Sequence, residues 1–211
     1  MKLQKLCHLL LIFTLSIIGC NSSVNRSIHI RNGKTVHHSL NSVNGSVIVG
    51  SDCEIKGNCR SVNGRVEVGR NSEVGDLQTV NGRISVESNV EVDGDIESVN
   101  GSVSCDPGVK IRGKIASING SIDLDSTEVR RDIVTYNGHI TLSNNSIVQR
   151  DIIIKDSKSR SNSRRPLKIR IEDGSIVEGD IIVRNDDKKV EVYLVDGGKV
   201  MGRIEGAEVI R

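Results

Sequence analysis

Pairs of apolar residues separated by one polar residue return at nearly constant spacing through most of the chain. Val66 and Val68, for example, flank the charged Glu67. This alternation is the period-two pattern of a β-strand that buries one of its faces. Equivalent pairs are Val47/Val49, Ile84/Val86, Val103/Cys105, Ile122/Leu124 and Ile140/Leu142.

Two further apolar positions follow each pair before the pattern starts again. The first holds Ile55, Val74, Val92, Ile111, Val129 and Val148, and the second holds Cys59, Leu77, Ile96, Ile115, Ile133 and Ile152. Three short strands separated by corners and repeated every 18 or 19 residues are typical of a single-stranded parallel β-helix. The sequence therefore predicts an all-β solenoid whose successive coils stack about 4.8 Å apart.

The last apolar position lets the coils be counted beyond the regular part of the chain. It recurs from Leu40 to Ile152, and then at Ile181 and Ile204 after steps of 29 and 23 residues. These longer steps indicate insertions near residues 155–165 and 185–189. We expect about nine coils within residues 28–211 and a rod roughly 40 Å long. The usual crossover of parallel strands favours a right-handed coil.

A tripeptide of the form Val/Ile/Tyr-Asn-Gly marks one point of each regular coil. Asn and Gly both adopt positive φ readily, so the pair fits a tight corner, and stacked Asn side chains can exchange amide hydrogen bonds. A two-residue hairpin turn is the alternative, but the strict spacing favours the corner. The pairs are Asn44 and Gly45, Asn63 and Gly64, Asn81 and Gly82, Asn100 and Gly101, Asn119 and Gly120, and Asn137 and Gly138.

Residues 1–19 differ in composition from everything after them. Lys2 and Lys5 precede an apolar run that is too short to cross a bilayer, so the segment is typical of a signal peptide. The run ends in Ile17-Ile18-Gly19-Cys20, which resembles a bacterial lipobox. That resemblance implies a lipidated Cys20 as the mature N-terminus, with residues 20–27 as the tether to the membrane. An ordinary secretory signal is the alternative.

Composition narrows the classes of partner. Aromatic residues are limited to Phe13, Tyr136 and Tyr193, so the core must be built from stacked Val, Ile and Leu side chains. The chain has 29 basic and 27 acidic residues, and removing residues 1–19 takes away two lysines and leaves 27 of each. A formally neutral, exported chain is not expected to bind nucleic acid.

A polar row precedes the last apolar position and is the strongest candidate for metal binding. Stacked carboxylates could bind calcium, but Lys114 interrupts the row and Arg131 and Arg150 adjoin it, which favours a solvated corner. The row contains Asn58, Asp76, Asp95, Lys114, Asp132, Asp151, Asp180 and Arg203.

Histidines and hydroxyl residues give no sign of catalysis. No histidine has a ligand-like partner four residues away or a nearby cysteine pair, so we expect surface histidines at His29, His37, His38 and His139. We expect neither a catalytic site nor a bound metal or cofactor, and therefore no enzyme.

Three cysteines follow Cys20. Cys59 and Cys105 align with aliphatic core positions, which favours free thiols in the core. Export would permit a disulfide between Cys53 and Cys59, although six residues of extended chain often separate two thiols too far.

The first insertion carries Lys158, Arg160, Arg164 and Arg165 among serines. These side chains could contact anionic envelope polymers, but a solvated loop is favoured.

Short motifs relate the chain to a known family. Residues 92–96 (VDGDI) and 177–181 (VEGDI) resemble the repeats of bactofilins, bacterial polymer-forming cytoskeletal proteins with a right-handed β-helix core. The similarity covers most of residues 28–209 and implies the fold and end-to-end self-association. The chain also resembles uncharacterised bacterial proteins with the same SVNGSI-type repeat. Bactofilins usually lack a lipobox and the Asn-Gly row, and commonly act on the cytoplasmic side.

We therefore expect a structural or interaction lipoprotein of the bacterial envelope, a rigid rod anchored to the membrane through Cys20. Asn21 after the cysteine favours the outer membrane, facing the periplasm. The expected partners are the membrane, further copies of the chain, and an envelope glycan or protein. The alternative is a carbohydrate-binding or polysaccharide-degrading β-helix, for which Tyr136 and Tyr193 are the available aromatic platforms.

Overall fold

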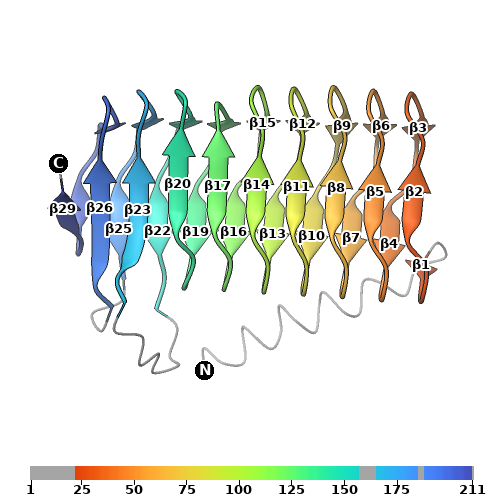
Figure 1. The fold of residues 1–211 in the computed structure, drawn as a ribbon, viewed down its shortest axis with the longest axis horizontal. Helices are drawn as coiled ribbons and strands as arrows, with labels where there is room; N and C mark the ends of the chain where they lie inside the picture. Colours follow the sequence, from red (N-terminus) through yellow and green to blue (C-terminus); the bar gives the residue numbers. More distant parts are fainter. Residues whose placement is uncertain (1–21, 157–164, 185–187, 211) are drawn as a thin grey trace.

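The structure is a computed structural model that describes residues 22–156, 165–184 and 188–210. Within these residues, the regular secondary structure consists of β-strands of two to five residues and includes no helix. The strands form three parallel sheets, A, B and C, which wrap around one long core (Figure 1). Each coil visits sheet A, then sheet B, then sheet C before the next coil begins.

The regular strands of sheet A begin at the last apolar position of each repeat. Its strands, in spatial order, are β1 (Ser22–Ser23), β4 (Leu40–Ser42), β7 (Cys59–Ser61), β10 (Leu77–Thr79), β13 (Ile96–Ser98), β16 (Ile115–Ser117), β19 (Ile133–Thr135), β22 (Ile152–Ile154), β25 (Ile181–Val183) and β28 (Ile204–Glu205).

Sheet B contains the alternating apolar pairs. Its strands are β2 (Ile28–Ile30), β5 (Val47–Val49), β8 (Val66–Val68), β11 (Ile84–Val86), β14 (Val103–Cys105), β17 (Ile122–Asp125), β20 (Ile140–Ser143), β23 (Leu167–Ile171), β26 (Val190–Leu194) and β29 (Glu208–Ile210).

Sheet C has the shortest strands, each of two residues. They are β3 (Thr35–Val36), β6 (Glu54–Ile55), β9 (Glu73–Val74), β12 (Glu91–Val92), β15 (Lys110–Ile111), β18 (Glu128–Val129), β21 (Ile147–Val148), β24 (Ile176–Val177) and β27 (Lys199–Val200).

The register of the sheets confirms the parallel β-helix. Leu77 pairs with Cys59 in the preceding coil and with Ile96 in the following coil, so equivalent residues stack directly. Neighbouring described strands pair in parallel throughout, in about nine turns, which makes the hairpin alternative wrong. The right-handed sense stays a prediction.

Both insertions leave the same corner of the solenoid. They lie between β22 and β23 and between β25 and β26, where the chain passes from sheet A to sheet B. Residues 157–164 and 185–187 within them are outside the described residues. The register continues past them, since Ile152 pairs with Ile181 and Ile169 with Val192. Extra residues are therefore accommodated at one corner without disturbing the sheets.

The core is a column of aliphatic side chains from all three sheets. In one central coil, Ile115, Ile122, Leu124 and Val129 are each at most 1% exposed. Burying one such side chain contributes roughly 1.5–3 kcal/mol. Because each coil packs only on the coils before and after it, stability accumulates along the rod as in other repeat proteins.

The three cysteines are buried free thiols. Cys59 stacks between Leu40 and Leu77, and burial raises the pKa of its thiol to about 12. The Cys53 thiol instead lies at the corner before sheet C and donates to the carbonyl of Arg31 at 3.2 Å. The disulfide considered between Cys53 and Cys59 is therefore not formed, because the two residues lie at separate positions around the coil.

Candidate functional site

The Asn-Gly pairs form a ladder of side-chain amides along the corner between sheets A and B. Each Asn donates through Nδ2 to Oδ1 of the Asn in the preceding coil, at 2.8–2.9 Å. Bonds arranged in one chain polarise one another, so the ladder strengthens cooperatively. Its members are Asn25, Asn44, Asn63, Asn81, Asn100, Asn119 and Asn137. Of these, the members up to Asn119 are exposed.

The glycine of each pair is required by close approach of the coils, and our expectation of positive φ at this corner was wrong. None of the six pairs contains a residue with positive φ. A Cβ atom added to Gly101 would overlap the backbone carbonyl of Gly82 in the preceding coil, and one on Gly120 would overlap that of Gly101. The glycine position of this corner therefore excludes every side chain, because successive backbones stack there without room for a Cβ atom.

A buried hydroxyl two residues before each Asn completes the motif. Ser61 Oγ donates to the carbonyl of Gly45 at 2.8 Å, and Thr79 Oγ1 donates to that of Gly64 at 2.9 Å. These hydroxyls satisfy carbonyls that the turning backbone leaves unpaired. Sequence reasoning missed this role, although the recurrent Ser or Thr of the motif is its signal. The hydroxyl residues at this position are Ser42, Ser61, Thr79, Ser98, Ser117 and Thr135. Ser98 and Ser117 donate to the glycine carbonyl of their own coil, and Thr135 accepts the N–H of Gly138.

Lys188 occupies the C-terminal end of the ladder. Its ammonium donates to Oδ1 of Asn137 at 2.8 Å and to the carbonyl of Tyr136 at 3.1 Å. Partial burial lowers the pKa of Lys188 from its usual value. The lysine lies at the start of the segment that leads into β26, two coils beyond Asn137. Since 51 residues separate the two, the first insertion intervenes and Lys188 itself lies in the second, no sequence signal pairs them.

Positive φ is used at a different corner, between sheets B and C. Asp52, Asn71 and Asn89 have φ of 58°, 57° and 59°. Asn and Asp tolerate this conformation better than other side chains. They also form a shorter ladder, because Asn71 donates to Asp52 at 3.2 Å and Asn89 donates to Asn71 at 3.3 Å.

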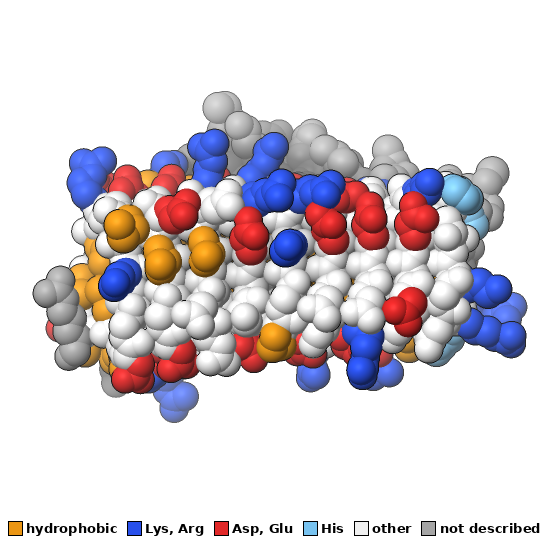
Figure 2. Space-filling view, turned by 90° about the horizontal axis from the view of Figure 1, so that it is seen from above, with side chains coloured by type: hydrophobic (Ala, Val, Ile, Leu, Met, Phe, Trp, Pro, Cys, Tyr) orange, Lys and Arg blue, Asp and Glu red, His pale blue; other side chains and the backbone are white. Residues whose placement is uncertain are grey.

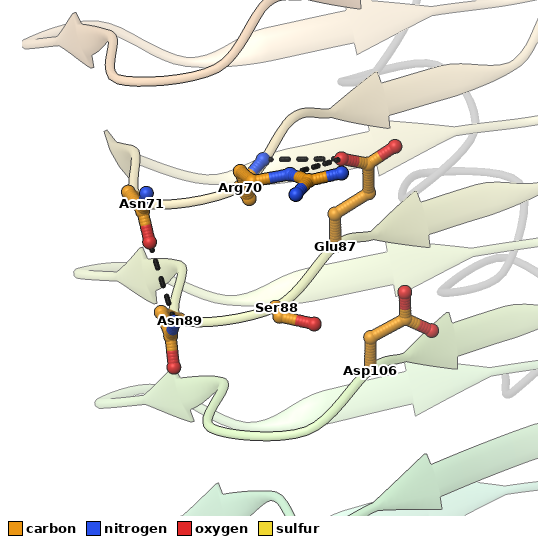
Figure 3. A pocket seen from close by; sticks show the side chains of 6 residues that line it. All are labelled: Arg70, Asn71, Glu87, Ser88, Asn89 and Asp106. Atoms are coloured by element: carbon orange, nitrogen blue, oxygen red, sulfur yellow. Dashed lines mark hydrogen bonds and ion pairs between the residues drawn. The ribbon is translucent and has the colours of Figure 1, made fainter.

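A shallow polar groove of about 470 Å³ lies beside this second corner (Figure 3). The backbone N–H of Arg70 donates to Glu87 Oε2 at 3.2 Å, and the Arg70 guanidinium lies 4.0 Å from the same oxygen. The groove offers hydrogen-bonding groups to a polar molecule, but its arginine is already paired. It is lined by Arg70, Asn71, Glu87, Ser88, Asn89 and Asp106.

The polar row that we considered for calcium lies at the third corner, between sheets C and A. Asp76 Oδ1 accepts the backbone N–H of Asp95 at 3.0 Å, and Asp95 Oδ1 accepts that of Lys114 at 2.9 Å. Asp151 accepts the N–H of Asp180 in the same way at 2.8 Å. One oxygen of each bonded carboxylate thus holds the next coil in place.

Cations lie among these carboxylates. The Lys114 ammonium lies 3.3 Å from Asp95 and 2.9 Å from Glu97. Burial alone would lower the pKa of Lys114, but the hydrogen bonds and attraction to the two carboxylates outweigh it and raise that pKa. Within the described residues, no group of three or more His, Cys, Asp or Glu side chains is arranged to hold a metal ion.

The outer face of sheet C changes character along the rod. Glu54, Glu73 and Glu91 stack in register, and Asp93 lies nearby. Repulsion by Asp93, with smaller contributions from burial and the two flanking glutamates, raises the pKa of Glu73. Figure 2 shows acidic side chains towards one end of this face and hydrophobic ones towards the other. Close to that apolar end, Met201 is 69% exposed.

The outer face of sheet B presents one aromatic ring near its C-terminal end. Lys168 Nζ and Arg170 Cζ each lie 5.5 Å from the centroid of the Tyr193 ring. The Tyr193 hydroxyl donates to Glu191 at 2.8 Å, and this hydrogen bond raises the pKa of Tyr193. The ring is thereby fixed on the surface of β26 beside two cations.

The described histidines lie in two separate places. His29, His37 and His38 are exposed on the first described coil, whereas His139 accepts the backbone N–H of Lys168 through Nδ1 at 2.9 Å. The structure brings no sequence-predicted histidine together with another candidate residue as a catalytic set.

Several sequence predictions fall outside the described residues. Cys20 and three of the basic residues of the first insertion, Lys158, Arg160 and Arg164, lie there, while Arg165 is described and exposed. In the part of the chain that the structure covers, no helix is long and apolar enough to cross a membrane.

Comparisons with protein-family models, with curated proteins and with solved structures found no match. The resemblance to bactofilins therefore rests on the short sequence motifs alone.

Proposed function

We propose that this chain is a lipoprotein of the bacterial envelope that acts as a rigid rod anchored to the membrane by one end. The observation that carries the proposal is the position of the lipobox-like segment. Cys20 precedes β1, the first strand of the solenoid, by two residues. A lipid on Cys20 would therefore hold the rod by its first coil and project the other coils away from the bilayer. Asn21 favours the outer membrane, facing the periplasm.

The construction of the rod supports a mechanical or binding role rather than a catalytic one. Its core is continuous from Leu40 to Val192, and polar ladders tie successive coils together at the corners. A structure held in this way resists bending and keeps groups on its faces at fixed spacing. The partner would be an envelope protein, a glycan or a further copy of the chain.

Lipidation is tested by expressing the full chain in a bacterium supplied with labelled palmitate. The label is expected in the membrane fraction and on the protein. The Cys20→Ala variant should carry no label and lose its membrane association. Equal labelling of both chains would refute the anchor, and a soluble, cleaved wild-type chain would indicate an ordinary secretory signal.

Self-association end to end is the second part of the proposal. The strands of the first and last described coils have a neighbour on one side only, so each end presents unpaired backbone groups. Val209 of β29 is 40% exposed at the C-terminal end. In the chain without its lipid, both ends are free, so sedimentation equilibrium and electron microscopy over a concentration series should reveal linear assemblies that lengthen with concentration. A single monomeric species at every concentration would remove this part.

A carbohydrate-binding role is the alternative, and the Tyr193 surface favours it. A half-buried ring beside Lys168 and Arg170 suits apolar and charge contacts with an acidic sugar. Titration with an acidic oligosaccharide should then show binding that the Tyr193→Ala variant loses. Binding that is unchanged in the variant would exclude this surface.

A further inference from the structure

Positive charge is concentrated at the N-terminal end of the rod. Residues 22–51 contain Arg26, Arg31 and Lys34 and no Asp or Glu, and Asp52 is the first acidic residue of the chain. The chain as a whole has 29 basic and 27 acidic residues, so its charges are nearly balanced. The first described coil is therefore a local departure from the composition of the rod.

These three cations and two histidines surround the end of the solenoid. Arg26 lies at the corner before β2, Arg31 and Lys34 lie at the corner between β2 and β3, and His37 and His38 lie at the corner before β4. All five side chains are exposed. Figure 2 shows Lys, Arg and His side chains at this end of the rod. We call these five residues the basic rim.

The basic rim encloses apolar side chains. Ile28, Ile30 and Val36 pack on the core but remain partly exposed, because no coil among the described residues covers them from the N-terminal side. Val24, at the same end, is 59% exposed. An apolar centre with a cationic border matches the boundary between acyl chains and anionic headgroups.

The charges of the basic rim are not neutralised within the described residues. None of Arg26, Arg31 and Lys34 forms an ion pair there. At the opposite end, Lys189 pairs with Glu208 at 3.1 Å and Arg203 pairs with Glu205 at 3.5 Å. Three of the four described acids of the last coil, Glu191, Glu205 and Glu208, are thus already paired, which leaves Asp196 alone to offer a second copy, and a glycan would leave the apolar centre uncovered.

We infer that the N-terminal coil docks directly on an anionic phospholipid surface through the basic rim and its apolar centre. The inference rests on the proposed lipoprotein anchor for its geometry. Two residues of extended chain span about 7 Å, so a lipid on Cys20 would hold this coil against the headgroups. Each cation near an anionic surface strengthens binding roughly fivefold, and three together about 100-fold.

The test uses the mature chain, residues 20–211 with Cys20→Ser, which contains every strand of the described fold but no acyl group. Binding is measured by sedimentation with vesicles of phosphatidylcholine alone or mixed with phosphatidylglycerol. We expect binding to the phosphatidylglycerol vesicles only, weakening as salt is added. The variant Arg26→Gln/Arg31→Gln/Lys34→Gln should bind about 100-fold more weakly.

The matched control removes the same charge elsewhere. Arg150, Lys155 and Arg184 are exposed and form no ion pair among the described residues, so their triple Gln variant tests net charge alone. It should bind within about threefold of the wild-type chain. Circular dichroism checks that all three chains are folded, and the salt dependence of the wild-type chain is an independent readout.

Equal losses in the two variants, or no preference for phosphatidylglycerol, would overturn the inference. Self-association that is lost only in the rim variant, without vesicle binding by the wild type, would assign the basic rim to a second copy. Palmitate labelling of Cys20 separates this inference from the anchor. An unlabelled chain with rim-dependent vesicle binding would refute the proposed lipid anchor alone. A labelled chain without vesicle binding would refute the proposed docking surface alone.

Discussion

Replacing Gly101 by Ala tests the explanation given for the Asn-Gly corner. Gly101 follows Asn100 between β13 and β14, and a Cβ there would overlap the carbonyl of Gly82. The residue does not have positive φ, so alanine adds no backbone strain of that kind. The whole cost must therefore arise from the distance between successive coils.

The expected loss of stability is about 4 kcal/mol. Overpacking usually costs about 1–3 kcal/mol, and we take the upper end because the opposing group is backbone and cannot rotate away. Separating the coils at this point also weakens the side-chain hydrogen bond from Asn100 to Asn81, which contributes about 1 kcal/mol. Urea unfolding followed by far-ultraviolet circular dichroism measures the difference in free energy of unfolding.

Gly197→Ala is the matched control. Gly197 has φ of +85°, and a Cβ there would approach Gly174 atoms no closer than 3.7 Å, an ordinary contact. Only the left-handed conformation is then penalised, at about 1–2 kcal/mol. If Gly101→Ala cost no more than Gly197→Ala, close approach would not be the reason for glycine in the Asn-Gly corner.

Three further changes examine the other stabilising contacts. Asp151→Ala should lower the free energy of unfolding by about 2 kcal/mol, because the backbone N–H of Asp180 loses its acceptor. Asp151→Asn keeps a neutral acceptor and should cost about 1 kcal/mol; equal losses in urea unfolding would contradict this. Lys188→Met should lower the free energy of unfolding by about 1 kcal/mol and speed hydrogen exchange of the Asn137 backbone amide. Unchanged exchange would show that the Lys188 ammonium does not stabilise the ladder. Burial raises the pKa of Cys59 from 9.0 to about 12 and also raises that of Cys105, so the folded chain keeps thiol protons that the unfolded chain loses above about pH 9. Stability should therefore fall between about pH 9 and 12, by at most about 1.4 kcal/mol per pH unit for each thiol, and less steeply in the Cys59→Val/Cys105→Val variant; identical slopes would contradict the assignment.

Much of the fold was predictable because side-chain alternation and repeat length are both visible in the sequence. Val66, Val68, Val74 and Leu77 mark three strands of one coil, and each occupies the core position expected for it. A slip of one residue would turn every apolar side chain outward, so the pattern also determined the register. The positions of the two insertions were predictable as well, because the repeat spacing is longer than 18 or 19 residues only there.

The reason for each corner residue was less predictable. Asn and Gly share a tolerance for positive φ, so the sequence could not distinguish that use of Gly64 from close packing of backbones. Positive φ falls instead on residues such as Asp52, Asn71 and Ser126, whose identities vary from coil to coil. A repeat can be detected in the sequence when the same side chains stack in successive coils. It cannot be detected there when only the backbone conformation is the same from coil to coil.

The Asn ladder and the Asp row share one hydrogen-bond direction, which connects Lys188 with the basic rim, although the buried serines before sheet C bond in the opposite sense. Every bond of the Asn ladder runs from the amide nitrogen of one coil to the oxygen of the preceding coil, and the N–H of Asp180 donates to Asp151 in the same sense. Aligned dipoles of this kind add, as they do in an α-helix, leaving donors towards the first coil and acceptors towards the last. Lys188 lies at the acceptor end of the ladder, where a cation is stabilised. The basic rim lies at the donor end, where its charges raise a potential that is already positive. Because no acidic residue of the first coil offsets that potential, an anionic surface outside the chain is the partner that its electrostatics favour.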